Sequence, residues 1–136
     1  MTTHEHINYW LAIAAHDYDS AQACLEHGEY FWCMQISHVV LEKALKANWV
    51  RESNQAVPKL FNLCKIAEAA ALNLSEEQTR FLVDLAIFDL EKPEIDDELK
   101  AFKLCTKEFT HEQFGKVKEL YRFLISPLHS EPIRNL

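Results

Sequence analysis

The sequence predicts an all-α fold, an up-and-down bundle of five to six helices that forms a single domain over residues 1–136. Only two glycines and four prolines occur, which leaves few positions for the tight turns of β-hairpins. Apolar residues recur at three- and four-residue steps along most of the chain, the spacing of an amphipathic helix. The composition, 49% hydrophobic and 26% charged, is that of one soluble globular domain.

The first two helices are predicted to form an antiparallel hairpin. Thr2 and Glu5 have the spacing of a capping box, which marks a helix start, and apolar residues follow at the helical period: Ile7, Trp10, Leu11, Ala14, Tyr18, Ala21 and Leu25. Gly28 is suited to the left-handed position that ends a helix. The second helix starts at Tyr30 and runs to Trp49 without Gly or Pro, so the two helices should lie side by side.

The second helix is predicted to lie at the centre of the bundle, because it is apolar on more than one side. One face carries Phe31, Met34, His38, Leu41, Leu45 and Trp49, and the other sides carry Cys33, Ile36, Val40, Ala44 and Ala47. Its segment His38–Ala47 (HVVLEKALKA) adds Glu42, Lys43 and Lys46. Either the lysines pair with local carboxylates in a solvated strip, or they present positive charge to a ligand.

After a break at Glu52–Pro58, two further helices are predicted. The first covers about Lys59–Ala71 and turns Leu60, Leu63, Cys64 and Ala67 inward. Ser75 and Gln78 have the spacing of a second capping box. They open a helix whose buried face carries Phe81, Leu82, Leu85 and Phe88.

The C-terminal part is predicted to hold a short helix and a long one. Leu90–Glu98 is predicted to form a charged loop that caps the short helix. Three lysines are expected to align on this helix: Lys100, Lys103 and Lys107. Thr110 and Gln113 form a third capping-box pattern that starts the last helix. Ser126–Pro127 is expected to stop it, so that the core covers about residues 4–126 and residues 127–136 form a loosely held tail.

Charge and hydropathy limit the location and the partners. The net charge is −7, which disfavours nonspecific attraction to DNA or to an anionic membrane. The N-terminus lacks the pattern of a secretion signal and no segment is long and apolar enough to span a bilayer, so we expect a cytoplasmic protein. The charge is uneven, however: from Lys43 to Lys65 five basic residues accompany the single acid Glu52, which is compatible with a local positive surface.

No metal site or cofactor is expected. His4–His6 and His16–Asp19 contain ligand-type residues, but neighbouring positions on a helix point to different sides. His38 reads as a core histidine bonded to a nearby acceptor. The four cysteines lie far apart inside apolar patterns, as buried free thiols do: Cys24, Cys33, Cys64 and Cys105.

The candidate functional residues are basic. The candidates for holding a phosphate are Lys43, Lys46, Lys100, Lys103 and Lys107, with Phe102 and Phe109 placed for base stacking; a solvated lysine face is the alternative. Arg122 and His129 are the candidates for catalysis. If they meet across a turn at Pro127, His129 can shuttle a proton and Arg122 can stabilise the charge that develops during RNA cleavage. Chance spacing is the alternative.

The order of several segments resembles the HEPN family (higher eukaryotes and prokaryotes nucleotide-binding domain). The resemblance covers about Tyr9–Ser126. It rests on an Ala-rich first helix, Tyr30 leading into HVVLEKALKA, Pro58, Asn62-Leu63, LSEEQ from Leu74, Phe88, CTKEFT from Cys105, and KELYRFL. It implies a bundle of about five helices, like the substrate-binding domains of nucleotidyltransferases, that usually dimerises. Many members partner a minimal nucleotidyltransferase, often as a toxin–antitoxin pair, and others are metal-independent ribonucleases.

The chain departs from the branch that it most resembles at two places. Phe61 stands where a histidine commonly precedes Asn-Leu, and Lys92-Pro93 is all that remains of an Arg-Tyr-Pro. We therefore expect a homodimer that acts through binding, with a nucleotidyltransferase or another macromolecule as partner and a nucleotide or RNA phosphate as ligand. The alternatives are a metal-independent endoribonuclease, as in a toxin, and a structural dimer module whose activity has decayed.

Overall fold

The computed structural model describes residues 1–57, 62–90 and 95–134, with Ile95 and residues 129–134 described by their backbone alone. Within these ranges the chain forms six α-helices and one short 3₁₀ helix, η1, and no strand. Their bounds are α1 (Thr3–Glu26), α2 (Tyr30–Ser53), α3 (Leu63–Ala69), α4 (Glu76–Asp84), η1 (Leu85–Phe88), α5 (Ile95–Leu104) and α6 (Lys107–Arg134). The prediction of an all-α bundle is confirmed.

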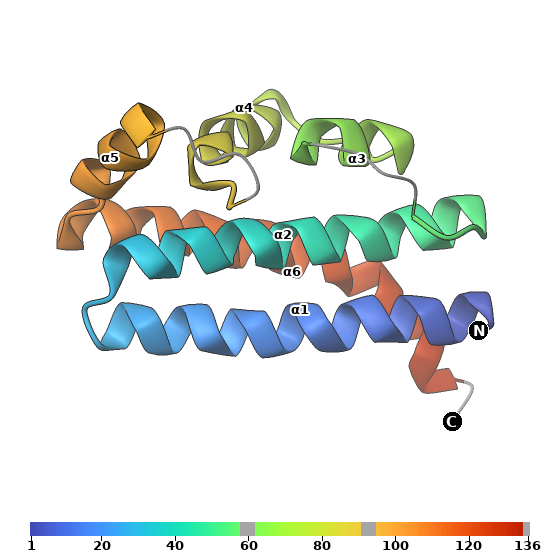
Figure 1. The fold of residues 1–136 in the computed structure, drawn as a ribbon. Coiled ribbons are helices and arrows are strands. Elements are labelled where there is room, and N and C mark those ends of the chain that lie inside the picture. The colour runs from blue at the N-terminus through green and yellow to red at the C-terminus, as the bar shows by residue number, and fades with distance from the viewer. Residues whose placement is uncertain (58–61, 91–94, 135–136) are drawn as a thin grey trace.

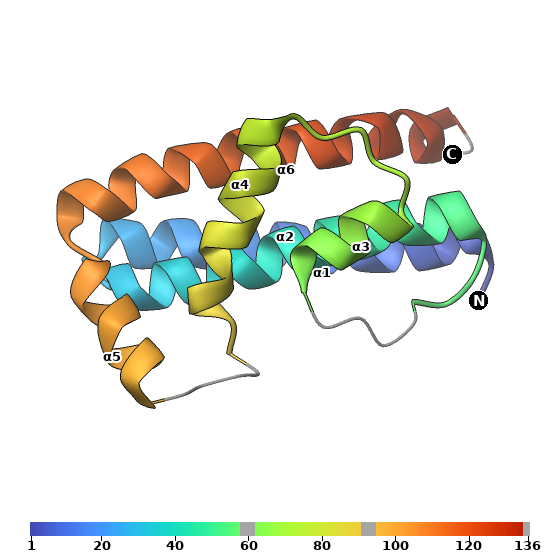
Figure 2. The ribbon, with the colours of Figure 1, turned by 90° about the horizontal axis from the view of Figure 1, so that it is seen from above.

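The helices form two layers (Figure 1). The long helices α1, α2 and α6 run alongside one another, and the short helices α3, α4 and α5 lie in a row above them. Seen from above, α4 crosses the long helices, with α5 to one side and α3 to the other (Figure 2). The helix α2 contacts α1, α6, α3 and η1, so its predicted place at the centre of the bundle is confirmed. None of the described helices combines the length and apolar character needed to cross a bilayer.

The α1–α2 hairpin follows from its capping residues. Thr2 and Glu5 form the predicted capping box, in which each side chain accepts a hydrogen bond from the backbone N–H of the other residue. At the other end Gly28 has a φ of +78°, as predicted. The N–H groups of Gly28 and Glu29 donate to the carbonyls of Leu25 and Cys24, the paired bonds of a Schellman motif. The chain therefore turns back within three residues.

The main core is built around α2. The apolar side chains of α2 that have no exposed surface lie on several sides of the helix: Cys33, Met34, Val40, Leu41, Ala44, Leu45 and Ala47. Asn48 is also buried, and its Nδ2 donates to the carbonyl oxygens of Ala44 at 2.9 Å and Leu124 at 3.0 Å. The second of these bonds ties α2 directly to α6.

The third helix is shorter than predicted. It covers Leu63–Ala69, with the Asn62 side chain accepting from the N–H of Lys65 as its N-cap. Lys59 and Leu60, which the sequence placed on this helix, lie outside the described residues. The capping box of Ser75 and Gln78 is present and opens α4, so that prediction is confirmed.

The start of the last helix was predicted wrongly. α6 begins at Lys107, where Thr106 accepts from the N–H of Phe109. Thr110, the predicted cap, is buried one turn inside the helix, and its hydroxyl donates to the carbonyl of Thr106 at 2.7 Å. The predicted cap is therefore replaced by the threonine four residues earlier.

The predicted stop at Ser126–Pro127 is also wrong, because α6 continues to Arg134. A proline inside a helix costs a backbone hydrogen bond and crowds the preceding turn. Leu128 is only 1% exposed, however, and belongs to a second apolar cluster with Ile7, Leu11, Ala47 and Val50. Burial of Leu128 against α1 and α2 offsets the local preference of Pro127.

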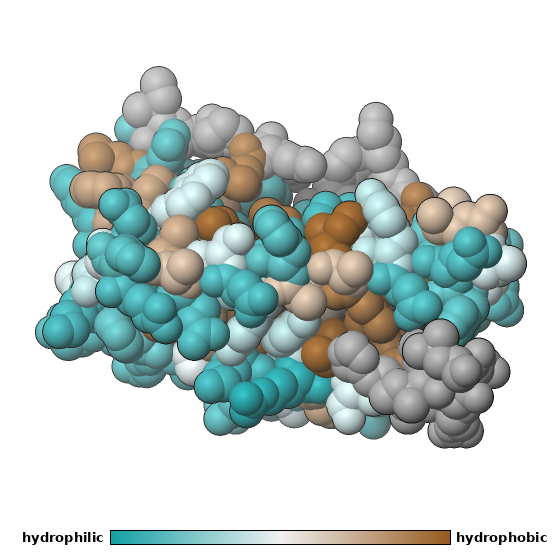
Figure 3. All heavy atoms as spheres, turned by 90° about the horizontal axis from the view of Figure 1, so that it is seen from below, coloured by the Kyte–Doolittle hydropathy of each residue, from teal (hydrophilic) through white to brown (hydrophobic). Residues whose placement is uncertain are grey.

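The face of the molecule on the α1 side, away from the layer of α3, α4 and α5, is largely hydrophilic (Figure 3). Apolar side chains gather in a strip near its middle, between hydrophilic areas. Tyr9 of α1 and Phe123 of α6 are among the exposed large apolar residues of the two helices.

Candidate functional site

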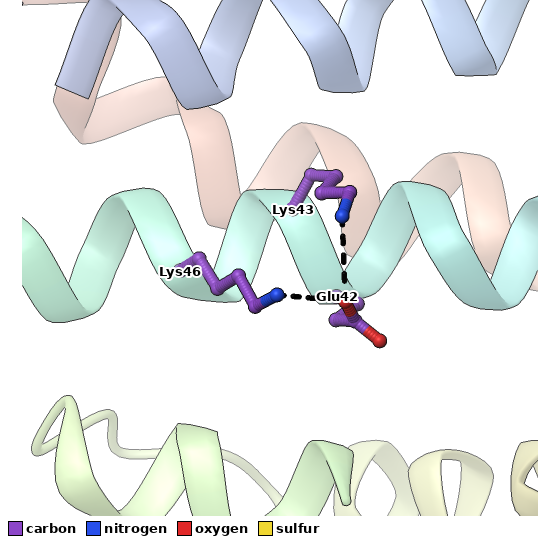
Figure 4. Close-up of polar contacts among 3 residues, drawn as sticks. All are labelled: Glu42, Lys43 and Lys46. Atoms are coloured by element: carbon purple, nitrogen blue, oxygen red, sulfur yellow. Dashed lines mark hydrogen bonds and ion pairs between the residues drawn. The ribbon is translucent and has the colours of Figure 1, made fainter. Parts of the chain in front are cut away.

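The charged cluster of α2 is a local ion-pair network (Figure 4). The carboxylate of Glu42 lies 2.9 Å from Nζ of Lys46 and 3.5 Å from Nζ of Lys43, through the same oxygen. Both ammonium groups also lie over the ring of Trp10 from α1, with Nζ of Lys43 5.3 Å and Nζ of Lys46 5.1 Å from its centroid. The three charged side chains are only about one-fifth exposed.

This environment favours the ionised cluster. Burial opposes ionisation of Glu42, but the hydrogen bond and charge of Lys46, together with the charges of Lys43 and His38, hold the pKa of its carboxyl below the usual range. The pairing of Lys43 and Lys46 with a local carboxylate is the first of the two interpretations that the sequence left open. The cluster still carries one more positive than negative charge.

Removing the Glu42 carboxylate is expected to destabilise the fold. Glu42→Ala leaves two partly buried ammonium groups without their acceptor, which we expect to lower the free energy of unfolding by about 2 kcal/mol at pH 7. Because the folded pKa of Glu42 is depressed, its contribution is fully present above the unfolded value of 4.5 and is lost as the pH falls through the folded value. Urea unfolding at pH 7 and pH 3 should therefore give a smaller difference between variant and wild type at pH 3.

The second group of candidates lies on a different part of the molecule. Lys100 and Lys103 are on α5, whereas Lys107 is the first residue of α6, so the predicted alignment on one helix is wrong. All three lysines are exposed. None of them forms an ion pair with any residue that the structure describes. We call these three residues the lysine ridge.

The lysine ridge is well separated from Lys43 and Lys46 of α2, which we call the Lys43–Lys46 pair. Phe102, beside the ridge, is 60% exposed and contacts Phe31 of α2 edge to face, with ring centroids 5.5 Å apart. Lys43 follows Phe31 by twelve residues, about 18 Å along the helix at about 1.5 Å per residue. One phosphate group therefore cannot touch both lysine groups, whereas successive phosphates of a nucleic acid strand can.

The two catalytic candidates are on one continuous helix. Arg122 is exposed on α6, and its charge acts on the partly buried hydroxyl of Tyr18, whose pKa is raised by burial in spite of this charge. The backbone of His129 lies seven residues further along, about 10 Å along the helix axis, and its side chain is outside the described residues. The turn at Pro127 that was to bring the two together is absent.

A cavity beside α2 contains polar residues that sequence reasoning did not group. His38 is 4% exposed, as predicted for a core histidine, and lines a cavity of about 240 Å³ with Asn62, Cys64 and Asp89. These residues come from α2, from the start of α3 and from the end of η1, so no local spacing connects them. Phe61 and Lys92-Pro93, the two departures from the HEPN pattern, lie outside the described residues.

Thiols and metal ligands give no further site among the described residues. All four cysteines are free, and Cys33 is fully buried while the other three are partly exposed. Burial raises the pKa of the Cys33 thiol to about 12, so it is not a nucleophile at neutral pH. No group of three or more metal-ligating side chains occurs in the described parts of the chain.

A family model matches most of this helical chain. The HEPN domain model matches residues 7–126. The chain belongs to the HEPN family. No curated protein and no solved structure matches it. The family is an all-helical bundle and a nucleotide- or RNA-related module, and the match in this HEPN domain begins within α1 and ends within α6.

Proposed function

We propose that this HEPN domain is a cytoplasmic, homodimeric binding module that holds the phosphates of a nucleotide or RNA and partners a minimal nucleotidyltransferase or another macromolecule. The observation that carries the proposal is the lysine ridge. Its three ammonium groups are exposed and have no ion pair with a described residue, so phosphate binding would displace no internal partner. The exposed ring of Phe102 beside them offers a surface on which a base can stack.

The Lys43–Lys46 pair has a secondary role in this proposal. Each ammonium would have to loosen its contact with Glu42 before it could bind a phosphate, since both share one carboxylate oxygen. The excess of one positive charge over Glu42 still attracts an anion. Replacing both lysines by alanine should therefore weaken binding less than replacing the ridge.

Loss of the ridge should weaken RNA binding in a salt-dependent way. For the triple variant Lys100→Ala, Lys103→Ala, Lys107→Ala we expect at least about tenfold weaker binding of a single-stranded RNA. Each phosphate contact contributes about 0.7 to the slope of log K against log salt on single strands, so the slope should fall by about 2. Fluorescence anisotropy at several salt concentrations measures both.

The control for the ridge variant is Lys65→Ala, at an exposed lysine on α3. It should bind RNA as the wild type does and with the same salt slope. Equal RNA affinity of the wild type and a folded ridge variant would rule out the ridge as the binding surface. Absence of RNA and nucleotide binding in the wild type would leave the structural dimer module with decayed activity as the better account.

The homodimer and the nucleotidyltransferase partner are the assembly part of the proposal. Exposed large apolar side chains such as Trp32 and Phe123, each 47% exposed, support an interface that covers some of them. Light scattering should give twice the chain mass of 15.8 kDa. A monomer mass at micromolar concentration would count against the dimer. Co-purification with the product of a neighbouring nucleotidyltransferase gene would test the partner.

The alternative function is a metal-independent endoribonuclease that uses Arg122 and His129. The helical separation of about 10 Å along α6 gives it no support within one chain, so we rank it second. An RNA cleavage assay in EDTA distinguishes the two functions. Cleavage that His129→Ala abolishes would favour the enzyme, and cleavage that survives this change would exclude these two residues.

A further inference from the structure

A cavity of about 510 Å³ lies between α4, η1, the end of α5 and α6. Neither the lysine ridge nor the Lys43–Lys46 pair lines it. It adjoins a second cavity of about 290 Å³, since Glu77, Phe81 and Lys116 line both. The volume is within the range of about 300–1,000 Å³ that is usual for small-molecule sites. Figure 2 shows α4 crossing the long helices next to α5, and these elements carry most of the residues that line the cavity.

Aromatic side chains form the inner surface of the cavity. Phe81 and Phe88 are 8% and 3% exposed, and Phe109 at the start of α6 is partly buried. Leu85, which is fully buried, and Leu104 complete the apolar part. A flat aromatic group would bury its faces against these side chains, and stacking of a base on an aromatic ring stabilises binding.

Polar side chains are arranged along the two walls. On α4, Glu77, Arg80 and Asp84 occur at i, i+3 and i+7, which places them on one face of the helix. On α6, Gln113 and Lys116 follow Phe109 at i+4 and i+7. Both walls therefore carry charged or hydrogen-bonding groups in addition to the aromatic side chains.

Two of the charged groups lack a partner within the described residues. Arg80 forms no hydrogen bond or ion pair there, and its planar guanidinium can bind a phosphate through two parallel hydrogen bonds. Asp84 precedes η1, but its side chain does not cap that helix, so the carboxylate remains available as an acceptor. Glu77 and Lys116 line the junction of the two cavities, and Nζ of Lys116 lies 4.0 Å from the carboxylate of Glu112 on the same helix.

The charged residues that line the cavity favour one class of ligand. Two cations and two carboxylates line the cavity, Arg80 and Lys116 with Glu77 and Asp84. Because Lys116 already pairs with Glu112, Arg80 is the lining cation that has no ion pair with a described residue. A lining with one such cation and two carboxylates disfavours a polyanion such as a nucleoside triphosphate. It favours a ligand that combines one phosphate with hydrogen-bond donors, because a carboxylate accepts from a base amino group such as N4 of cytosine.

We infer that this cavity binds a nucleoside monophosphate with an amino-bearing base: the base lies against Phe88 and Phe109 with its amino group donating to Asp84, and the phosphate is held by Arg80. The choice of a nucleotide rests on the proposed function. The place of the site, the contacts of Asp84 and Arg80 with the ligand, and the separation of the site from the lysine ridge are argued from the cavity. Gln113, on the facing wall, provides both a donor and an acceptor for the base edge.

Calorimetric titration with CMP and UMP tests the inference on the full chain, since the two ligands differ at the base by an amino group and a carbonyl oxygen. Wild-type protein should bind CMP at least about tenfold more tightly than UMP, a difference of about 1.4 kcal/mol. Arg80→Ala should weaken both ligands by a similar factor, because it removes the phosphate contact. Asp84→Asn should bring the CMP and UMP affinities close together, since an amide can donate to the uracil carbonyl.

Two controls make the outcome decisive. Lys65→Ala, away from the cavity, should leave CMP binding unchanged, and circular dichroism should confirm that each variant is folded. Equal affinities for CMP and UMP in the wild type, or unchanged CMP binding in Arg80→Ala, would overturn the inference. Loss of CMP binding in the ridge variant would place the site elsewhere. RNA binding through the ridge without CMP binding would reject this inference alone. CMP binding in the cavity without RNA binding through the ridge would reject the proposed role of the ridge alone.

Discussion

Leu45→Ala is expected to lower the free energy of unfolding by about 3 kcal/mol, one of the two largest effects that we expect from a single change in this HEPN domain. Leu45 has no exposed surface and belongs to the main core around α2. Truncating a buried leucine removes its transfer free energy and leaves a cavity, at a cost of about 2–5 kcal/mol. The neighbours of Leu45 are held by several helices, so they cannot close the gap by a small local shift.

Chemical denaturation of Leu45→Ala, followed by far-ultraviolet circular dichroism, measures this effect. Leu99→Ala is the matched control, because Leu99 on α5 is 51% exposed and the same truncation there removes little buried area. The control should change the free energy of unfolding by less than about 0.5 kcal/mol. Equal destabilisation by the two variants would contradict the central place of α2 in the core.

The α1–α2 hairpin could be predicted from the sequence because its signals are local. The capping box at Thr2 and Glu5, the left-handed Gly28 and the apolar sides of α2 each depend on residues within a few positions of one another. The same holds for Ser75 and Gln78 at the start of α4. Where short-range spacing and tertiary packing agree, the pattern predicts the element correctly.

The ends of α6 could not be predicted because tertiary contacts decide them. Thr110 has the spacing of a cap, but it lies in the core, where its hydroxyl bonds back to the carbonyl of Thr106. Pro127 is a local stop signal, and the helix continues past it because Leu128 packs on α1 and α2. Neither fact is visible in the spacing of nearby residues.

The candidate site was predicted in part for a similar reason. The cluster of Glu42, Lys43 and Lys46 is local, and the sequence already offered the ion pair as one interpretation. Trp10, which completes that cluster, comes from another helix. The cavity lined by Arg80 and Asp84 draws its residues from α4, η1, α5 and α6. Only the crossing of α4 over the long helices brings them together.

Asn48→Asp is the second change with a large expected effect, because it removes both donors of a buried amide. Nδ2 of Asn48 donates to the carbonyls of Ala44 and Leu124, and its side chain is almost fully buried. An ionised aspartate of the same shape would place a buried negative charge against two carbonyl oxygens. We expect a loss of about 3 kcal/mol or more in the free energy of unfolding at pH 7, since an unpaired buried charge costs more than a lost neutral hydrogen bond.

The pH dependence of Asn48→Asp distinguishes this cause from a simple loss of packing. Burial and the two carbonyls raise the pKa of the new carboxyl above its unfolded value of about 3.9. The destabilisation is therefore full above the folded pKa and fades as the pH falls toward the unfolded value, where the protonated carboxyl can donate one of the two bonds. Urea unfolding from pH 7 to pH 4 should show the gap to the wild type narrowing. Asn73→Asp, at an exposed asparagine, should show no such trend. A gap for Asn48→Asp that stays constant with pH would contradict the buried charge as the cause of the destabilisation.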